Sequence, residues 1–502
     1  MKDYYISSFV WGVLSKILNA VFGVISVPLL LTCFGVENYG VLTLATSVNA
    51  YMHLLDLGMN TGSIKFFSQW IYAKENELLD SVARTNLSFY GIIGIINASV
   101  LVFISFFGRS LFNISDEQFL LLQRLLWITA FFSIFNWINS VFSQLLTAAQ
   151  KIAFVHKMMC LVIASKIALV YITLFFSLSV TCYFFFFTLS LAILILPYAF
   201  VCKKDNLLLS MIPCFEWKKF SIVFSYSLSI FVLNFFQVSA TASRAVILGM
   251  FASSAAVAVA HYNIVQLMPS FILSISGILS SLLLPKASVI AKKNDLESTK
   301  SYLEKGTKVS SILCVSLCIP IVLCSKGLLS FIVGPEYIHL HAWLAVTIVA
   351  FCINLPTSTY YSMVLAIGKT KKIVWATAIF CVLSIVLNAV MAPIVGMGSA
   401  ILAYLIFVIG VCFYNFVFYY PNLFKLKISF LVKPLVLPFV LGCIPAAQLY
   451  YIFSFVDYSQ LSRFECLGWS ALISVLWFMV YAALLLMFKE VSLDDLKKRL
   501  KR

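Results

Sequence analysis

The sequence predicts an all-α, polytopic membrane protein with about fourteen transmembrane helices, and three observations lead to that prediction. Hydrophobic residues make up 62% of the 502 residues and charged residues 11%, which is more apolar surface than a water-soluble chain of this length buries. Apolar runs of about 18–25 residues recur along the whole chain, and each is long enough to cross a bilayer as a helix. Lysine and arginine gather in alternate connecting segments, as the positive-inside rule requires of cytoplasmic loops.

The predicted spans follow one another with short connections. The longest connection, 285–306, is expected to lie on the membrane surface, and no segment is long enough to fold as a domain outside the membrane. The spans are centred near Phe22, Tyr51, Gly94, Phe132, Ala168, Ala192, Asn234, Leu267, Ser316, Phe351, Phe380, Phe407, Val440 and Val475.

The net charge of +16 arises in the connections and does not indicate a nucleic-acid-binding surface. Basic residues follow every even-numbered span and form the C-terminal tail, whereas the other connections hold little beyond Arg109, Lys326 and Arg463. The basic set is therefore expected to be cytoplasmic, with both termini on that side. The first ten residues lack the basic region of a signal peptide, so no signal peptide distinct from the first span is expected.

The thirteen cysteines lie mostly within apolar spans and include no CxxC pair. We interpret them as small core or lipid-facing residues rather than as a disulfide framework. His339 and His341 have no further metal ligands in sight, and no Ser/His/Asp grouping or acidic pair suggests hydrolysis. The expectation is a transporter and not an enzyme, with no catalytic residue, metal or cofactor.

The polar residues of the first and seventh spans share one spacing. Lys16, Asn19, Gly23 and Ser26 recur 218 residues later as Asn234, Gln237, Thr241 and Arg244, and these steps form one stripe on a helix. A repeat of this kind is typical of transporters built from two related bundles. It predicts two six-helix lobes around a central cavity, with two extra helices. The predicted segments are an N-terminal lobe at 1–202, a cytoplasmic linker at 203–219, a C-terminal lobe at 220–421, and two transmembrane helices with a basic cytoplasmic tail at 422–502.

Three cations lie well inside predicted spans, namely Lys16, Lys166 and Arg244. Hydrocarbon rejects such groups, so they usually face a protein interior or an aqueous cavity. With few acids available as partners, they would attract an anion such as a phosphate, a pyrophosphate or an acidic sugar. The alternatives are snorkelling of the side chain to the interface, above all for Lys16, and a structural ion pair.

The second span carries His53 and Asp56, and Asn60 follows on the same face of a continuous helix. Asp56 and His53 are the candidates for coupling to an H⁺ or Na⁺ gradient. The alternative is that Asp56 joins helices by pairing with Lys16 or Lys166.

The fourth span has a nearly continuous polar face. A whole stripe of amides and hydroxyls favours a wet cavity, whereas interhelical hydrogen bonds would explain only a few such groups. Amides beside Trp127 and Trp137 would suit a sugar, which offers hydroxyls and flat apolar faces. The polar candidates for substrate binding are Asn19, Asn136, Asn139, Gln144, Asn234 and Gln237.

Residues 10–70 resemble the start of the O-antigen flippases, the Wzx-type members of the polysaccharide transporter family, within the wider group of MATE drug exporters and lipid II flippases. Lys65 stands where that family usually has a basic residue. Related proteins often carry an acid where the seventh span has Arg244, so a cation site based on that acid is not supported here. The matching residues are Pro28-Leu29, Phe34-Gly35, Tyr39-Gly40 and Leu54-Leu55-Asp56-Leu57-Gly58.

The resemblance implies two six-helix lobes in a V-shape about a central cavity, in the bacterial inner membrane. It also implies a role in lipopolysaccharide biosynthesis: an undecaprenyl-pyrophosphate-linked oligosaccharide would move from the cytoplasmic to the periplasmic leaflet. The implied partners are this lipid, the bilayer and other polysaccharide assembly proteins, such as a polymerase or a chain-length regulator.

Two other functions stay open from the sequence. A drug or cation antiporter on the same fold would favour acids and aromatic residues in its cavity, and this chain has many aromatic residues but few buried acids. A membrane enzyme such as an O-antigen polymerase would be expected to have a sizeable periplasmic loop with reactive side chains, which the short connections do not provide.

Overall fold

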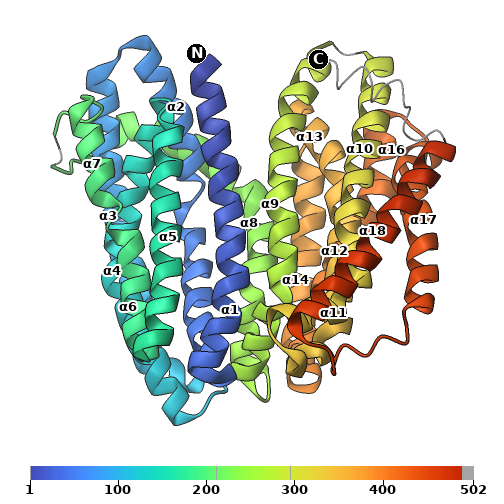
Figure 1. Ribbon diagram of the computed structural model, residues 1–502. Helices are drawn as coiled ribbons and strands as arrows, with labels where there is room; N and C mark the ends of the chain where they lie inside the picture. Colours follow the sequence, from blue (N-terminus) through green and yellow to red (C-terminus); the bar gives the residue numbers. More distant parts are fainter. Residues whose placement is uncertain (1, 211, 294, 489–502) are drawn as a thin grey trace. The chain divides into compact units, whose positions relative to one another are not determined.

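A computed structural model describes residues 2–210, 212–293 and 295–488, with the side chains at 2–6, 9, 229, 230, 233, 234, 274–282, 284, 285, 292 and 293 outside the description. Within these ranges every regular element is helical and there is no strand (Figure 1). The elements up to residue 251 are α1 (Lys2–Met52), η1 (His53–Asp56), α2 (Met59–Ala73), α3 (Asn76–Phe107), η2 (Gly108–Ser110), α4 (Asp116–Ala148), α5 (Ile152–Phe176), α6 (Val180–Ala192), α7 (Ile195–Lys204) and α8 (Trp217–Phe251). The later elements are α9 (Ala255–Lys293), α10 (Leu296–Leu323), α11 (Ser325–Ile332), η3 (Pro335–Leu340), α12 (His341–Asn354), η4 (Leu355–Thr357), α13 (Ser358–Ile367), α14 (Lys371–Val395), α15 (Gly398–Tyr414), η5 (Asn415–Tyr419), α16 (Tyr420–Phe424), α17 (Ile428–Ile452) and α18 (Arg463–Met487).

The predicted fold class is confirmed. Among the described residues, 12 helical segments are long and apolar enough to cross a membrane, and one of them, Val10–Asp56, contains the first two predicted centres. The seventh predicted centre lies in α8, whose apolar part Phe235–Phe251 is shorter. Each predicted centre falls within a helix. The chain is therefore a multi-pass helical membrane protein.

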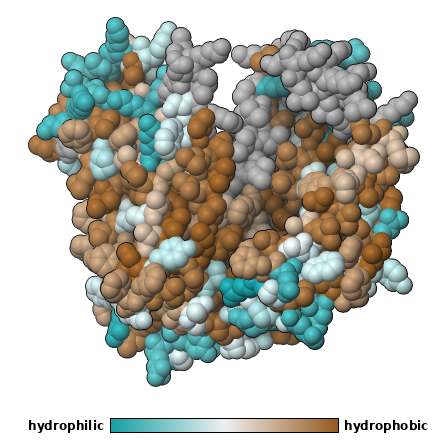
Figure 2. Space-filling model, viewed as in Figure 1, coloured by the Kyte–Doolittle hydropathy of each residue, from teal (hydrophilic) through white to brown (hydrophobic). Residues whose placement is uncertain are grey.

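The chain forms two compact units. Unit 1 consists of Met1–Tyr262 with Ile385–Ala400, and unit 2 of Asn263–Ser384 with Ile401–Arg502. The lobe boundaries expected from the sequence, at 1–202 and 220–421, stay a prediction. On the face of unit 1 in Figure 2, hydrophobic residues cover the middle of the helices and hydrophilic residues gather at their ends, as a membrane-spanning bundle requires.

A single glycine makes the turn between the first two spans. Gly35 has φ 75° and ψ 165°, so α1 consists of two helical parts that meet at this residue. Glycine alone adopts such a backbone without steric cost. The connection between the first two predicted spans is thereby reduced to one residue, and helix continues on both sides.

The second span is broken, which the sequence did not predict. After η1 the backbone becomes left-handed at Leu57 (φ 52°) and Gly58 (φ 75°), and α2 then begins. The prediction of one helical face from His53 to Asn60 is therefore wrong, because the helix it assumed is interrupted. A positive φ is uncommon at a leucine.

Small residues allow α2 to approach α8 closely. A Cβ atom at Gly62 would lie 1.9 Å from Ser227 Oγ, and one at Gly58 would lie 2.4 Å from the Ser227 carbonyl oxygen. Close approach of backbones at small residues is a common way for membrane helices to associate. The two glycines thus set the position of the broken span against α8.

Within the predicted cytoplasmic linker, 203–219, the described residues between α7 and α8 are bound along α3, and we call them the strap. The Leu209 N–H donates to Asp80 Oδ1 at 2.7 Å, Arg84 Nε donates to the Ile212 carbonyl at 2.7 Å, and Ser88 Oγ donates to the Cys214 carbonyl at 2.6 Å. At its end the Lys219 ammonium lies 2.7 Å from Glu216, and this hydrogen bond lowers the pKa of the Glu216 carboxyl.

The two C-terminal helices belong to the core of unit 2. Trp477 of α18 is fully buried, and its Nε1–H donates to the Gly442 carbonyl of α17 at 3.0 Å. Val315 of α10 lies in the same hydrophobic cluster as Trp477 and Tyr481. The last two spans therefore pack as an integral part of this unit.

Candidate functional site

The break in the second span places Asp56 against α3. Tyr90 Oη donates to Asp56 Oδ1 at 2.5 Å, and the backbone N–H of Asn60 donates to Asp56 Oδ2 at 3.2 Å. The second contact places the carboxylate at the beginning of α2, where the free N–H groups and the helix dipole favour a negative charge. Both oxygens of this carboxylate thus accept a hydrogen bond.

Behind Tyr90 a chain of side-chain hydrogen bonds continues through the helices. Gln144 Nε2 donates to Tyr90 Oη at 2.7 Å, and Asn86 Nδ2 donates to Gln144 Oε1 at 2.9 Å. Asn86 Nδ2 also donates to Ser63 Oγ at 3.0 Å. We call these four residues with Asp56 the Asp56 network; it links η1, α2, α3 and α4.

Three hydrogen bonds of the Asp56 network run in one direction, from Asn86 through Gln144 and Tyr90 to Asp56. Successive bonds of one direction polarise each other, so the chain stabilises a negative charge at its end. Protonation of Asp56 would remove that charge and weaken the bond from Tyr90. The hydrogen bonds thereby connect the Asp56 carboxylate to the contact between α3 and α4.

The network is buried at one end and accessible at the other. Asn86, Ser63 and Tyr90 are 0% exposed and Gln144 is 1% exposed, whereas Asp56 is only half-buried. Asn86 Oδ1 is buried and has no hydrogen-bond partner among the described residues. Buried polar groups are otherwise nearly always satisfied, because an unpaired group costs substantial free energy in a packed interior.

Aromatic rings form a wall beside the network. The Trp137 ring lies 5.8 Å from the Tyr90 ring, in a stacked arrangement, and 5.4 Å from the His53 ring. Close approach of α3 and α4 permits this, because a Cβ at Gly94 would lie 2.9 Å from the Ile134 Cα atom. His53 is exposed and lies beside Asp56 at the accessible end.

The lysines lie apart from Asp56. Four ion pairs occur among the described residues, and Asp56 is in none of them, so the alternative pairing with Lys16 or Lys166 is not formed. Lys16 is exposed on α1, as is Asn19. The Lys166 ammonium lies over the Phe187 ring, 3.9 Å from its centroid, and its side chain is half-buried. A cation over an aromatic face is stabilised without an acidic partner.

Arg244 is buried within unit 1. It is 4% exposed, and its guanidinium donates to the Tyr262 hydroxyl at 3.2 Å and to the Ala240 carbonyl of its own helix at 3.0 Å. Asn388 Nδ2 donates to the Arg244 carbonyl at 3.4 Å, and Asn388 Oδ1 accepts from Ser399 Oγ at 2.8 Å. These contacts supply a structural role for Arg244, and its assignment to substrate binding stays a prediction.

The remaining candidates are scattered. Gln237 is exposed on α8, whereas the side chain of Asn234 lies outside the described residues. Asn136 and Asn139 of α4 are half-buried, and Asn139 Oδ1 has no hydrogen-bond partner among the described residues. Gln144 differs from both, because it faces the packed interior between α3 and α4 and belongs to the Asp56 network.

Sequence reasoning missed three members of the network, Ser63, Asn86 and Tyr90. Two of them lie in the third span, where the sequence indicated only an apolar run. The available signal was the pair of polar residues Asn86 and Tyr90, one helical turn apart.

The fold matches solved membrane transporters. The lipid II flippase MurJ in its inward closed conformation has a TM-score of 0.70 and 16% sequence identity, over 97% of this chain and 99% of that chain. An inward-facing multidrug resistance MATE family transporter of the MOP superfamily has a TM-score of 0.63 and 16% identity, over 85% of this chain and 99% of that one. MATE in the bent conformation has a TM-score of 0.54 and 15% identity, over 87% and 97%.

No protein-family model matches the sequence. No curated protein matches it either. The identities to the solved structures are low, so the comparisons show the fold. The predicted MATE-like fold, which lipid II flippases share, is confirmed.

Proposed function

We propose that this chain is a flippase that moves an undecaprenyl-pyrophosphate-linked oligosaccharide, an O-antigen or similar repeat unit, from the cytoplasmic to the periplasmic leaflet of a bacterial inner membrane. The observation that supports it most is the fold shared with a lipid II flippase along nearly the whole chain. The lipid substrate of that protein agrees with the sequence resemblance to O-antigen flippases.

The extent of the matches favours a flippase over a drug antiporter. The match to MurJ covers 97% of the 502 residues and that to the MATE transporter 85%, a difference of about 60 residues, which is the length of the segment from α17 through α18. These two helices pack on α10 as part of unit 2.

The physical task also fits a transporter of this build. An oligosaccharide headgroup in hydrocarbon would lose its hydrogen bonds with water, at a cost of about 2–7 kcal/mol for each uncompensated hydroxyl. A polar cavity between two lobes that opens to alternate sides lowers this barrier. The central cavity and the alternating access are part of the proposal.

Lys16 and Lys166 are the proposed contacts of the pyrophosphate or of acidic sugars. Both lie in membrane-spanning helices, α1 and α5, that pack against each other, and neither forms an ion pair among the described residues. Lys16 is exposed. A cation in a span without an acidic partner is suited to an anionic ligand.

Asp56 is the proposed site of coupling to an H⁺ or Na⁺ gradient. Its carboxylate is half-buried at a helix break and stands at the end of a one-directional hydrogen-bond chain. Broken helices are typical of ion sites in secondary transporters. Proton or sodium binding there would change the charge to which Tyr90 donates, and so bias the packing of α3 on α4.

Transport is tested with the full chain reconstituted in vesicles. A fluorescent undecaprenyl-pyrophosphate-linked oligosaccharide is placed in the bilayer, and its movement is followed by its accessibility to a membrane-impermeant quencher. We expect faster equilibration between leaflets than in empty vesicles. A Lys16→Gln, Lys166→Gln double variant should be slower, whereas Lys326→Gln, outside the spans, should match the wild type.

Two results would contradict the proposal. One is the absence of lipid movement in vesicles that hold folded protein. The other is transport of a cationic dye against a proton or sodium gradient by the same vesicles without lipid movement, which would identify a drug antiporter.

A further inference from the structure

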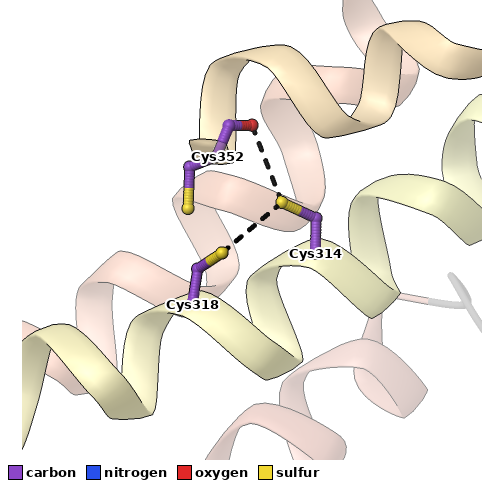
Figure 3. Close-up of side chains that lie close together, drawn as sticks. All are labelled: Cys314, Cys318 and Cys352. Carbon is purple, nitrogen blue, oxygen red and sulfur yellow. Dashed lines mark hydrogen bonds between the residues drawn. The ribbon is translucent and has the colours of Figure 1, made fainter. Parts of the chain in front are cut away.

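Three cysteines of unit 2 meet in its packed interior (Figure 3). Cys314 and Cys318 lie one turn apart on α10, so that both side chains project from the same face, and Cys352 lies in the last turn of α12. The sulfur atoms of Cys314 and Cys318 are 3.9 Å apart, and all three sulfurs lie within 4.8 Å of one another. Their exposed fractions are 0%, 0% and 4%.

The position of one of these thiols is explained by a backbone carbonyl that needs a hydrogen-bond donor. Cys314 Sγ donates to the Cys352 carbonyl at 3.7 Å. In a regular helix that carbonyl would accept from the residue four positions later, but Pro356 has no N–H, and the Leu355 N–H donates to Phe351 instead. The Cys314 thiol satisfies this carbonyl. The sulfur atoms of Cys318 and Cys352 have no such explanation.

The distances suit a metal ion held by three sulfurs. With a metal–sulfur bond of about 2.3 Å, as zinc forms, an ion at the centre of three sulfurs requires sulfur–sulfur separations of about 4 Å. The separation of 3.9 Å already meets this value, and the others need shifts below about 1 Å. Pro320, two residues beyond Cys318, removes a hydrogen bond of α10 and eases such an adjustment.

The type and the number of the ligands select the ion. Sulfur ligands favour copper(I), zinc and iron–sulfur clusters. Zinc takes four ligands and the common clusters take four cysteines, whereas the described residues supply three. Copper(I) accepts three sulfur ligands. The thiolate is the form of cysteine that binds a metal, so binding would release one proton for each thiol that becomes a ligand.

We propose that Cys314, Cys318 and Cys352 form a copper(I) site that joins α10 to α12. This site is separate from the proposed transport site in unit 1 and does not depend on the transport function. Because the ion would bind the folded chain and not the separated helices, it would stabilise unit 2.

The affinity for copper(I) tests the site. The full chain is purified in detergent with a reductant that lacks thiols and is titrated with copper(I) in competition with a chromogenic chelator. We expect one tightly bound ion per chain, with only sulfur neighbours in the X-ray absorption spectrum. Cys318→Ser and Cys352→Ser should each weaken binding by about 100-fold or more.

Matched controls come from other buried cysteines. Cys202 and Cys324 are 0% and 1% exposed, and each donates to a backbone carbonyl, like Cys314. Cys202→Ser and Cys324→Ser should bind copper(I) as the wild type does. Copper(I) should raise the unfolding temperature of the wild type and of these controls but not of the two site variants, each of which must be monodisperse without copper.

Three outcomes would overturn the proposal. The first is an unchanged copper(I) affinity in both Cys318→Ser and Cys352→Ser. The second is an equal loss of affinity in the control variants. The third is tighter binding of zinc than of copper(I), which would contradict the assignment of copper(I) to the site. Since two site variants are used, failure of one to fold leaves the other as the test.

Discussion

The Tyr90 hydroxyl donates a hydrogen bond of 2.5 Å to the Asp56 carboxylate, across the point at which the second span is broken. The same hydroxyl accepts from Gln144. A proton or cation bound at Asp56 would therefore change the strength of the hydrogen bonds in the buried contact between α3 and α4. These hydrogen bonds join an acidic residue of a membrane span to the contact between two helices of the bundle.

Replacement of Tyr90 by phenylalanine should disconnect Asp56 from the other residues of the Asp56 network. Tyr90→Phe removes the donor to Asp56 and leaves Gln144 Nε2 without its acceptor in a buried place. We expect a loss of about 1–3 kcal/mol in the free energy of unfolding and slower transport. Thermal unfolding and the vesicle assay measure both effects. Unchanged stability and transport in this variant would contradict the link between Asp56 and the α3–α4 contact.

The variant Asp56→Asn distinguishes a role of Asp56 in ion coupling from a role as a structural ion-pair partner. The variant should fold and reach the membrane but lose its dependence on the ion gradient. Since no ion pair joins Asp56 to Lys16 among the described residues, a second change, Lys16→Met, should not restore the activity or abundance of Asp56→Asn. Restoration by that second change would instead indicate a charge pair formed in another state of the protein. Full gradient-dependent transport by the single variant would contradict the coupling role.

Arg244→Ala should lower protein abundance as well as activity. The guanidinium that bonds to Tyr262 is buried, and its removal leaves that hydroxyl without the donor, at about 1–3 kcal/mol. Arg244→Lys should retain part of the activity, because lysine keeps the charge but not the planar fork. Immunoblots and transport assays are compared. A normally abundant, inactive Arg244→Ala variant would favour substrate binding.

Gly62→Ala should disturb the contact of α2 with α8. The added Cβ would lie 1.9 Å from Ser227 Oγ, and overpacking of this kind costs about 1–3 kcal/mol. Ser227→Ala removes that oxygen and leaves the Ser227 Cβ, 3.2 Å away, as a close side-chain atom. We therefore expect the double variant to unfold at a higher temperature than Gly62→Ala alone. Equal unfolding temperatures of the two variants would contradict a direct contact between these two residues.

Asp80→Ala should release the strap formed by the predicted linker. The carboxylate accepts from the N–H of Leu209 and forms an ion pair with Arg84. Because a hydrogen bond to a charged group contributes about 1.5–3 kcal/mol, amide hydrogen exchange at Leu209 should accelerate by about tenfold or more. Arg109→Ala breaks the exposed ion pair with Asp116 and should leave that exchange rate unchanged. An unaltered rate in Asp80→Ala would contradict the strap.

The orientation in the membrane stays a prediction from loop charge. Reporter fusions at Glu37, Asn113 and Asp457 should report the periplasm, and fusions within 292–308 the cytoplasm, because the basic residues gather there. Cytoplasmic signals at two of the first three positions would reverse or alter the topology.

The helices of this protein could be predicted because their cause is local. A run of apolar residues such as 152–176 must form a helix in a bilayer, since its backbone groups have no water to bond to. For the same reason the sequence indicated the short connections, and the resemblance at residues 10–70 indicated a fold that the solved structures confirm. Asp56 and Gln144 were also recognisable, because polar groups are rare and costly in such spans.

By itself, then, the sequence determined that the chain is a multi-pass helical membrane protein and which polar residues enter its spans. Only the tertiary structure decided what those residues touch. The left-handed backbone at Leu57 and Gly58 lies close to α8, Tyr90 donates to Asp56 beside that break, and Arg244 turns inward to Tyr262. The hydrophobicity that predicts a membrane span is a property of consecutive residues. These contacts join residues far apart in the chain, so no local sequence pattern specifies them.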